Sequence, residues 1–386
     1  MTARSVLFID HAPALGGAEH SLLMLLSHLD RDQWQPHLAC ADGPVAECAA
    51  ALGIPVHLAP LERLRRSVSA PLSLAAGIRT LMHLSRDLHA ELLVANTVRA
   101  AFYGAPAACL LRIPFVWHRR DFWLGAAPPY VPWLDTAVKR CLCAAATRLI
   151  SNSEATARRH PCQHKVAVIP NGIEIQRFDP LLDGAPFRQA HGIASDLPVV
   201  GTVGRLSPGK RQDLFVRILA DVQKAVPDVW AVVTGGAIFG EDAYATKLRH
   251  LAEASGIARR LVLTGQLPDP VHALAAMDIF VQPGEPEAFG LVNIEAMAMA
   301  KPVVAFRHGA LPEIVVDGET GILVAPGDEA AMAEAILRLL HDPELRTRMG
   351  KAGRARVEKH FTIERVAEQV SEVFSRTLER PSSRNR

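Results

Sequence analysis

Two glutamates, Glu287 and Glu295, stand eight positions apart in the stretch EAFGLVNIE. Gly290 lies between them and opens an apolar run of helical character, which places Glu287 at the mouth of a predicted helix and Glu295 about one turn inside it. A carboxylate accepts paired hydrogen bonds from vicinal hydroxyls, and a helix N-terminus favours phosphates. The spacing therefore predicts a site for a sugar that is linked through a diphosphate to a nucleoside. The alternative is a helix-terminal charge at Glu287 and an internal ion pair at Glu295.

Two cations stand five positions apart in GRLSPGK, which follows a predicted strand. The guanidinium of Arg205 can clamp a diphosphate with two hydrogen bonds, and the ammonium of Lys210 adds a point charge. The pattern therefore indicates a diphosphate site. The alternative is a pair of solvated surface cations.

A pair of glycines, Gly16 and Gly17, follows the first predicted strand in HAPALGGAEHSLLMLL and opens a helix. Glycine lets the backbone approach a ligand closely, and the N–H groups at the start of a helix favour an anion. A plain strand-to-helix turn is the alternative. The loop does not have the G-x-G-x-x-G spacing, so a dinucleotide site is not supported.

One histidine, His118, ends the predicted strand in PFVWHRRDFW. Ligands of parallel sheets bind beyond the carboxyl ends of the strands, so we expect His118 to point into a cleft. Arg119 and Arg120 are candidates to face a substrate phosphate, and Asp121 is a candidate to orient either of them. The alternative for His118 is a structural histidine with its hydrogen bonds satisfied.

The elements that position these residues are short apolar strands alternating with helices. Seven strands are predicted in the first half, from VLFI to VAVIPNG, and six in the second, from PVVGTVGRL to GILVAPG. Continuous apolar strands of this kind are typical of parallel sheets covered by helices on both faces. We therefore predict an α/β protein with two doubly wound, Rossmann-like domains facing each other across a cleft. The expected divisions are a first domain at 1–178, a linker at 179–197, a second domain at 198–362, and a C-terminal helix at 363–380 that packs back onto the first domain.

Composition narrows the function classes. Hydrophobic residues make up 49% of the 386 residues, and the net charge is +2, so nothing global points to nucleic acid. We see no secretory signal and no apolar stretch long enough for a membrane span. No metal-ligand spacing is visible, and we expect neither a metal nor a cofactor. We interpret all six cysteines as buried free thiols of a cytoplasmic protein: Cys40, Cys48, Cys109, Cys141, Cys143 and Cys162.

Five motifs in order carry a family resemblance: SNSEAT, IPNGIEIQRF, GRLSPGK, PEAFGLVNIEAMA and GALPEIVVDGETGILVAPGD. Together they resemble the retaining glycosyltransferases of family 4, which have the GT-B fold. The resemblance implies that Arg205 and Lys210 hold the donor diphosphate, with the paired glycines near the phosphates. It implies that Glu287 contacts the transferred sugar, that Glu295 contacts the ribose, and that His118 lies near the donor sugar. Phe289, Gly290 and Leu291 of the same motif would also line the donor site.

The resemblance implies transfer of a hexosyl group from a nucleoside diphosphate sugar, by family analogy a UDP-sugar, to an acceptor hydroxyl with retention of configuration. Glycolipid or polysaccharide synthesis is the implied setting. The alternatives are a nucleotide-sugar epimerase of the same fold and a non-catalytic nucleotide-sugar-binding protein. One departure concerns the donor sugar: many relatives have two glycines where this chain has Gly309 followed by Ala310.

The acceptor side is a separate hypothesis. The segment WHRRDFWLGAAPPYVPWLD holds Trp117, Trp123, Trp133 and Tyr130, and a nearby segment alternates apolar runs with Arg63, Arg65, Arg66, Arg79 and Arg86. Aromatic side chains and arginines together suit an anionic membrane surface or a lipid-linked acceptor. We therefore hypothesise peripheral contact with the inner face of a membrane. The alternative is that the tryptophans fill the core of the first domain and the arginines are solvated.

Overall fold

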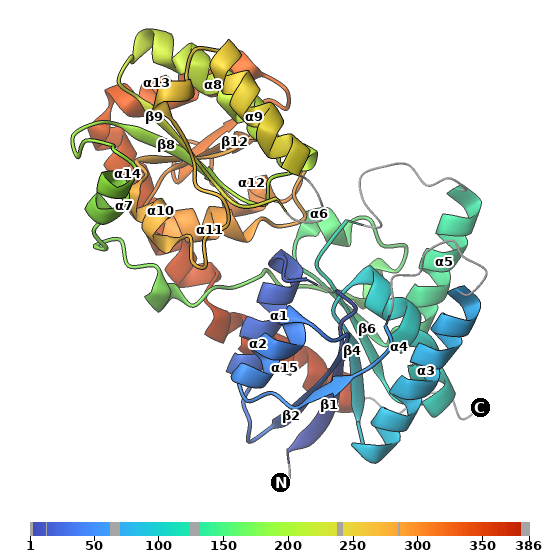
Figure 1. Ribbon diagram of the computed structural model, residues 1–386. Helices are drawn as coiled ribbons and strands as arrows, with labels where there is room; N and C mark the ends of the chain where they lie inside the picture. The colour runs from blue at the N-terminus through green and yellow to red at the C-terminus, as the bar shows by residue number, and fades with distance from the viewer. Residues whose placement is uncertain are drawn as a thin grey trace. The chain divides into compact units, whose positions relative to one another are not determined.

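The computed structural model describes residues 3–12, 14–61, 70–122, 132–237, 242–284 and 286–379. The chain divides into two compact units, one made of residues 1–172 and 363–386 and the other of 173–362. Both are α/β units (Figure 1). Several residues of the membrane hypothesis lie outside the described residues, namely Arg63, Arg65, Arg66, Trp123 and Tyr130.

A seven-stranded parallel sheet forms the centre of the first unit, in the order β3-β2-β1-β4-β5-β6-β7. Along β1 the side chains alternate, so Val6 and Phe8 enter the core on one face while Leu7 and Ile9 enter the core on the other. Helices α1, α2 and α15 cover the first face, and α3, α4 and α5 cover the second (Figure 1). The strands are β1 (Arg4–Ile9), β2 (Trp34–Cys40), β3 (Val56–Leu58), β4 (Leu92–Ala95), β5 (Phe115–Arg119), β6 (Arg148–Ser151) and β7 (Val166–Val168). The helices are α1 (Gly17–His28), α2 (Pro44–Ala51), α3 (Ala70–Asp87), α4 (Val98–Leu111), α5 (Pro132–Ala145), α6 (Glu154–Ala157) and α15 (Ile363–Glu379).

The C-terminal helix α15 belongs to the first unit although it follows the second unit in sequence. It packs beside α1. The indole N–H of Trp34 donates to the hydroxyl of Ser371 at 2.6 Å, and the ring of Phe374 meets the Trp34 ring edge-on at 5.5 Å between centroids. The strongly amphipathic pattern of α15 thus has its apolar side buried against the first sheet.

A six-stranded parallel sheet forms the second unit, in the order β10-β9-β8-β11-β12-β13. Helices α8, α9 and α13 cover one face, and α7, α10, α11 and α14 cover the other. The predicted α/β class and the two doubly wound sheets are confirmed. The strands are β8 (Val199–Val203), β9 (Trp230–Thr234), β10 (Leu261–Leu263), β11 (Ile279–Gln282), β12 (Val303–Phe306) and β13 (Gly321–Val324). The helices are α7 (Ala185–Ala190), α8 (Gln212–Ala225), α9 (Asp242–Ala254), α10 (Val271–Ala276), α11 (Leu291–Ala298), α12 (Leu311–Ile314), α13 (Glu329–His341) and α14 (Pro343–His360).

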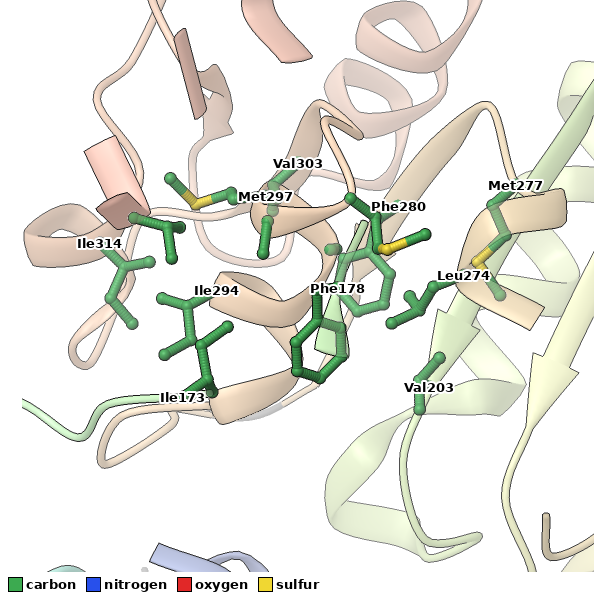
Figure 2. Packing of buried hydrophobic residues seen from close by; sticks show 14 of the residues in the cluster. Ile173, Phe178, Val203, Leu274, Met277, Phe280, Ile294, Met297, Val303 and Ile314 are labelled. Carbon is green, nitrogen blue, oxygen red and sulfur yellow. The ribbon is translucent and has the colours of Figure 1, made fainter. Parts of the chain in front are cut away.

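The segment predicted as a linker, 179–197, lies inside the second unit. Ile173 and Phe178, just before it, are buried among the core side chains of that unit (Figure 2). Within the segment, Arg188 of α7 donates to the backbone oxygen of Ala276 and pairs with Asp278 at 3.0 Å. The linker prediction was therefore wrong, because Ile193 of this polar stretch is buried in the core of the second unit, with Leu182 and Phe187 packed against that core.

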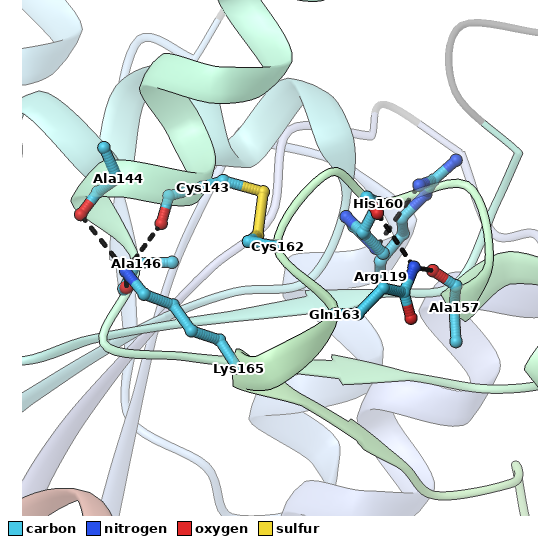
Figure 3. The surroundings of a disulfide bond; sticks show 9 residues. All are labelled: Arg119, Cys143, Ala144, Ala146, Ala157, His160, Cys162, Gln163 and Lys165. Carbon is cyan, nitrogen blue, oxygen red and sulfur yellow. Dashed lines mark hydrogen bonds between the residues drawn. A yellow bond between two sulfur atoms is a disulfide. The ribbon is translucent and has the colours of Figure 1, made fainter.

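The cysteine prediction was also wrong. Cys143 at the end of α5 and Cys162 form a disulfide (Figure 3). Of the other four thiols, Cys40 is buried, Cys48 is half-buried, and Cys109 and Cys141 are exposed. The disulfide joins α5 to the loop before β7, where Lys165 donates to the carbonyl oxygens of Cys143 and Ala146 at the end of the same helix.

The described part of the chain contains no helix that is long and apolar enough to cross a membrane.

Candidate active site

Two donor-side residues of the second unit, Lys210 and Glu287, meet beyond the carboxyl ends of β8 and β11. Lys210 lies in a 3-10 turn (Pro208–Lys210) after β8, and Glu287 lies in the loop after β11. The ammonium of Lys210 forms an ion pair with Oε1 of Glu287, and the side-chain amide of Gln282 donates to the same oxygen at 3.0 Å. Both charged groups are partly accessible, with side-chain exposures of 31% for Lys210 and 16% for Glu287. The structure therefore brings together two predicted site residues as a partly buried ion pair whose charges remain available to a ligand.

Arg205 follows β8 directly and is exposed. Its backbone oxygen accepts a hydrogen bond from the Gln212 side chain at 3.0 Å, and Leu206 N–H donates to the carbonyl of Gly236 at 2.9 Å. The loop that carries Arg205 and Lys210 is thus tied both to α8 and to the neighbouring strand end. It holds two cations at the carboxyl end of the sheet, where ligands of such folds bind.

The backbone of Glu287 is fixed by a close approach to Gly309. Ala310 N–H donates to the carbonyl of Glu287 at 3.0 Å. Gly309 has a φ of +56°, and a Cβ placed there would lie 2.4 Å from that carbonyl oxygen. Only glycine fits this position, whereas the next residue, Ala310, is buried without such a constraint. The contact with Glu287 therefore explains why position 309 needs a glycine and position 310 does not.

Helix α11 begins at Leu291, as predicted, and Gly290 precedes it with a φ of +89°. The side chain of Phe289 is buried and packs edge-on against Phe361 at 5.9 Å between ring centroids. Phe289 can therefore reach a ligand only through its backbone. Gly290 and Leu291 place the N–H groups of the helix start beside the Glu287 loop, where an anion is favoured.

Glu295 lies one turn into α11 and keeps part of its side chain accessible. Burial of the rest raises the pKa of its carboxyl to about 7; nearby Arg177 opposes the shift and Asp269 adds to it. Arg177 and Asp269 themselves form an ion pair at 2.9 Å. Sequence reasoning missed this pair, although Arg177 belongs to the motif IPNGIEIQRF.

In the glycine loop of the first unit, the backbone N–H of Gly16 is hydrogen-bonded to the side chain of Glu19. Gly16 directly precedes α1, and its N–H donates to Oε2 of Glu19 at 2.9 Å, which is the return bond of a capping box. A Cβ on Gly16 would meet that oxygen at 2.9 Å. Burial and the nearby charge of Asp10 raise the pKa of Glu19 to about 7. Gly17 is the first residue of α1, so both predicted glycines lie at the helix start.

A buried polar network connects the carboxyl ends of neighbouring strands of the first unit. The amide of Asn96, after β4, donates to Oδ2 of Asp10, after β1, at 2.6 Å. Its oxygen accepts from Nε of Arg120, after β5, at 2.8 Å, and Nη1 of Arg120 donates to Oδ1 of Asn171 at 2.5 Å. Asn96 and Asn171 were not singled out from the sequence, although each lies near the end of a segment predicted as a strand.

His118 lies inside this network and is buried in β5. Nη2 of Arg120 lies 3.4 Å from Nδ1 of His118. Burial, and secondarily the charge of Arg120, hold the pKa of His118 well below its usual range. At neutral pH the ring is therefore uncharged.

The two arginines after His118 are not open phosphate-binding cations. Arg119 is 1% exposed, donates through Nε to the carbonyl of Asp121 at 2.8 Å, and lies 3.3 Å from Nε2 of His160 (Figure 3). Arg120 is 6% exposed and is held by the network. The expectation that both arginines face a substrate phosphate was wrong, because strand β5 and its continuation turn both side chains into the unit. Burial raises the pKa of the neighbouring Asp121 to about 6, an effect that Arg119 opposes.

No cluster of three or more histidine, cysteine, aspartate or glutamate side chains with metal-ligand spacing occurs within the described ranges.

Family models match both halves of the chain. A model described as "Glycosyltransferase Family 4" matches residues 15–177, and one described as "Glycosyl transferases group 1" matches residues 184–356. Together these matches take in the glycine pair, the polar network except Asp10, and the donor-side residues of the second unit.

Curated relatives are about one third identical to this chain over the part that matches. A lipopolysaccharide core biosynthesis mannosyltransferase, LpsB, of Rhizobium meliloti is 34% identical over 54% of this chain and 60% of its own length. A GDP-mannose-dependent phosphatidylinositol monomannoside mannosyltransferase of Mycolicibacterium smegmatis is 36% identical over 48% of this chain and 50% of its own length. The matched part of the chain thus spans about 60% or less of each of these relatives.

Solved structures match almost the whole chain. The crystal structure of the Anabaena protein HepE in complex with UDP-glucose has a TM-score of 0.84 and 27% identity, and covers 96% of this chain and 99% of that one. A sucrose-phosphate synthase from Thermosynechococcus elongatus has a TM-score of 0.79 at 22% identity, which is a likeness of fold.

Proposed function

Because the chain belongs to the family 4 glycosyltransferases, with a second half of the group 1 type and the GT-B fold, we propose that it transfers a hexosyl group from a nucleoside diphosphate sugar to an acceptor hydroxyl. The observation that carries the proposal is the Lys210–Glu287 ion pair, partly accessible beside the start of α11. A cation and a helix N-terminus suit the diphosphate, and a carboxylate suits the sugar hydroxyls.

We propose that the reaction retains the anomeric configuration. The bond from the sugar C1 to the diphosphate oxygen breaks as the bond from C1 to the acceptor oxygen forms on the same face. The acceptor proton passes to the departing phosphate oxygen, and the charge of the diphosphate is stabilised by Arg205, Lys210 and the N–H groups at the start of α11. In this proposal Glu287 binds the transferred sugar and is not the nucleophile of a two-step reaction; Lys210 and Gln282 hold its Oε1.

Two nucleotides, GDP and UDP, are candidates for the nucleotide part of the donor. The name of the mycobacterial relative states dependence on GDP-mannose, while the HepE structure holds UDP-glucose. Family analogy favours a UDP-sugar. A thermal-shift panel of nucleoside diphosphate sugars tests the proposal, because a true donor raises the midpoint of unfolding by mass action. A panel in which neither UDP-sugars nor GDP-sugars shift the midpoint would contradict it.

We propose that the acceptor is a lipid-linked or polysaccharide sugar and that the first unit contacts an anionic membrane. Two of the relatives act in lipopolysaccharide core and phosphatidylinositol mannoside synthesis, by their names. Near the starts of α3 and α5, which both pack against α4, large apolar side chains are exposed: Leu72 by 75%, Trp133 by 73% and Leu134 by 48%. Trp117, in contrast, is fully buried, so the aromatic side chains of this region are divided between the core and the surface.

Membrane contact through α5 predicts that the double variant Trp133→Ser, Leu134→Ser binds less to vesicles that contain anionic lipid. Burial of apolar side chains in the interface drives such binding, and anionic headgroups add to it. Co-sedimentation measures the bound fraction, which we expect to fall with salt for the unmodified protein. Leu181→Ser is the matched control, because Leu181 is 89% exposed but lies in the second unit. Equal recovery of the unmodified protein in the supernatant with neutral and anionic vesicles would refute membrane contact.

The close approach at Gly309 predicts that Gly309→Ala lowers kcat/KM by about tenfold, equivalent to roughly 1.4 kcal/mol of lost positioning. A Cβ on residue 309 would lie 2.4 Å from the carbonyl oxygen of Glu287, so the Glu287 backbone must move. Gly318→Ala is the matched control, because Gly318 also has a positive φ, +78°, but has nothing within 4 Å of a Cβ. Both variants should lose stability through backbone strain. Equal activity of the two variants would show that the contact with Glu287 does not matter.

The raised pKa of Glu295 predicts a pH-dependent affinity for the donor. The ionised carboxylate accepts two hydroxyl hydrogen bonds, whereas the protonated form has given up part of that capacity. Because the pKa is about 7, affinity for a nucleoside diphosphate sugar should rise as the pH is raised through 7 and then level off. Calorimetric titration over this range measures it. In Glu295→Gln the affinity should be lower and flat, and a rise of the same size in that variant would assign the effect to another group.

A further inference from the structure

His118 and Arg120 are related by a contact that determines where the histidine carries its proton. A guanidinium has five N–H donors and no acceptor. Nη2 of Arg120 lies 3.4 Å from Nδ1 of His118, so a hydrogen bond between them requires Nδ1 to be the acceptor. A neutral imidazole carries a single N–H, which then lies on Nε2.

The guanidinium is held in this position from two other sides. Nε donates to Asn96 and Nη1 donates to Asn171, and the backbone oxygen of Arg120 accepts from the side chain of Asn152 at 3.1 Å. The neighbouring negative charges are Asp10, which bonds Asn96, and Glu19 at the glycine loop. These contacts leave Nη2 directed at the histidine. Nε2 of His118 has no hydrogen-bond partner among the described residues.

We propose that Arg120 is a positioning residue that holds His118 in the Nε2–H tautomer, so that His118 donates a hydrogen bond to an oxygen of the bound substrate and does not act as a proton acceptor. The part of this inference that concerns the substrate rests on the proposed glycosyl transfer. The part that concerns the tautomer does not. The substrate group that faces His118 is then an oxygen with a free lone pair, as a sugar hydroxyl or a phosphate oxygen has.

The chain contains an internal comparison. Arg119 makes the corresponding contact with His160, but to Nε2, at 3.3 Å. By the same argument His160 carries its proton on Nδ1. Two buried histidines, each beside an arginine of the same strand end, are therefore assigned opposite tautomers.

Long-range proton–nitrogen correlation spectra of the full chain with ¹⁵N-labelled histidine test the assignment. The signals of His118 and His160, among sixteen histidines, are identified by their loss in His118→Gln and His160→Gln. We expect an unprotonated Nδ1 in His118 and an unprotonated Nε2 in His160, unchanged between about pH 6 and about pH 8, where an ordinary histidine titrates. A protonated Nδ1 in His118, or a charged ring in this range, overturns the proposal.

Two arginine variants separate positioning from a merely structural role. Arg120→Lys should alter the tautomer signals of His118 and leave those of His160 unchanged, and Arg119→Lys should do the reverse. Loss of stability alone would leave both tautomers as they are. If Arg120→Lys and Arg119→Lys affect His118 equally, Arg120 does not hold the tautomer.

Enzyme kinetics provide a second test of the hydrogen-bond donor role of His118. The amide of Gln can place an N–H near the position of Nε2, whereas the shorter Asn cannot. His118→Gln should therefore keep about tenfold more kcat/KM than His118→Asn, as expected for one hydrogen bond to the substrate. Equal loss in both variants with the expected tautomer would remove the donor role. Absence of any transfer by the unmodified protein, with the expected tautomer, would instead contradict the proposed function and leave the tautomer assignment standing.

Discussion

Lys210→Ala should lower kcat by about 10²-fold or more, as is typical when a charge that stabilises a transition state is removed. The substitution removes the ammonium that we assign to the donor diphosphate. It also leaves the Glu287 carboxylate, 16% exposed, with Gln282 as its remaining side-chain partner. Steady-state kinetics with a donor identified in the thermal-shift panel measure the effect. Arg205→Ala should have an effect of the same order, and Arg205→Lys should restore part of it, because a lysine keeps the charge but not the two-pronged geometry.

A matched control is available in the same unit. Lys224 also pairs with a carboxylate, Asp221, at 2.6 Å, but both side chains are highly exposed, by 78% and 63%. An exposed pair of this kind contributes little, so Lys224→Ala should leave kcat unchanged. If Lys210→Ala is no more damaging than Lys224→Ala, the diphosphate is bound elsewhere.

The two glutamates should fail in different ways. Glu287→Ala should abolish most turnover, by about 10²-fold or more, while affinity for the free nucleoside diphosphate stays nearly intact, because its interaction is with the transferred sugar. Glu295→Ala should weaken both the free nucleotide and the donor by about tenfold to a hundredfold, the value of hydrogen bonds to a charged group. Isothermal titration with the nucleotide, combined with kinetics, separates the two effects.

The geometry supports this division. Glu287 lies in the loop before α11 beside Lys210, and Glu295 lies one turn inside the helix beside Arg177 and Asp269. Arg177→Ala provides a further comparison, because it removes the cation that opposes the raised pKa of Glu295 and should therefore weaken nucleotide binding at neutral pH. Equal loss of nucleotide affinity in Glu287→Ala and Glu295→Ala would show that the assigned roles are wrong.

The strands were predictable because their burial is continuous. Runs such as VLFI and PVVAF have no polar residue to place on a solvated face, so a parallel sheet covered on both faces is the architecture that accommodates them. The start of α11 at Leu291 was predictable from Gly290 and the apolar run after it. The linker was not, because a polar stretch with two prolines gives no sign that Ile193 enters the core.

The individual residues of the site were predictable from the sequence, but the contacts between them were not. Each of Arg205, Lys210, Glu287 and Glu295 has a local signal, but the pairing of Lys210 with Glu287 joins residues 77 positions apart. The polar network of the first unit joins residues after β1, β4, β5 and β7, whose ends share one edge because the strands are parallel and lie near one another because of the strand order. Arg119 at the end of β5 and Arg120 after it are buried in the unit, where the sequence suggested open cations. The Cys143–Cys162 disulfide has no local signal either, since no C-x-x-C spacing marks it.

The central claim is hexosyl transfer from a nucleoside diphosphate sugar with retention, and proton NMR of the first-formed product tests it most directly. The unmodified protein is mixed with UDP-α-glucose or GDP-α-mannose, with and without a lipid and polysaccharide extract as acceptor, and the anomeric signals are followed from the first minutes. We expect release of the nucleoside diphosphate together with an α-configured product, formed faster with acceptor than by slow transfer to water, and about 10²-fold slower formation of both with Glu287→Ala. A β-configured first product, a new sugar still attached to the nucleotide, or a donor that binds but never turns over would contradict it.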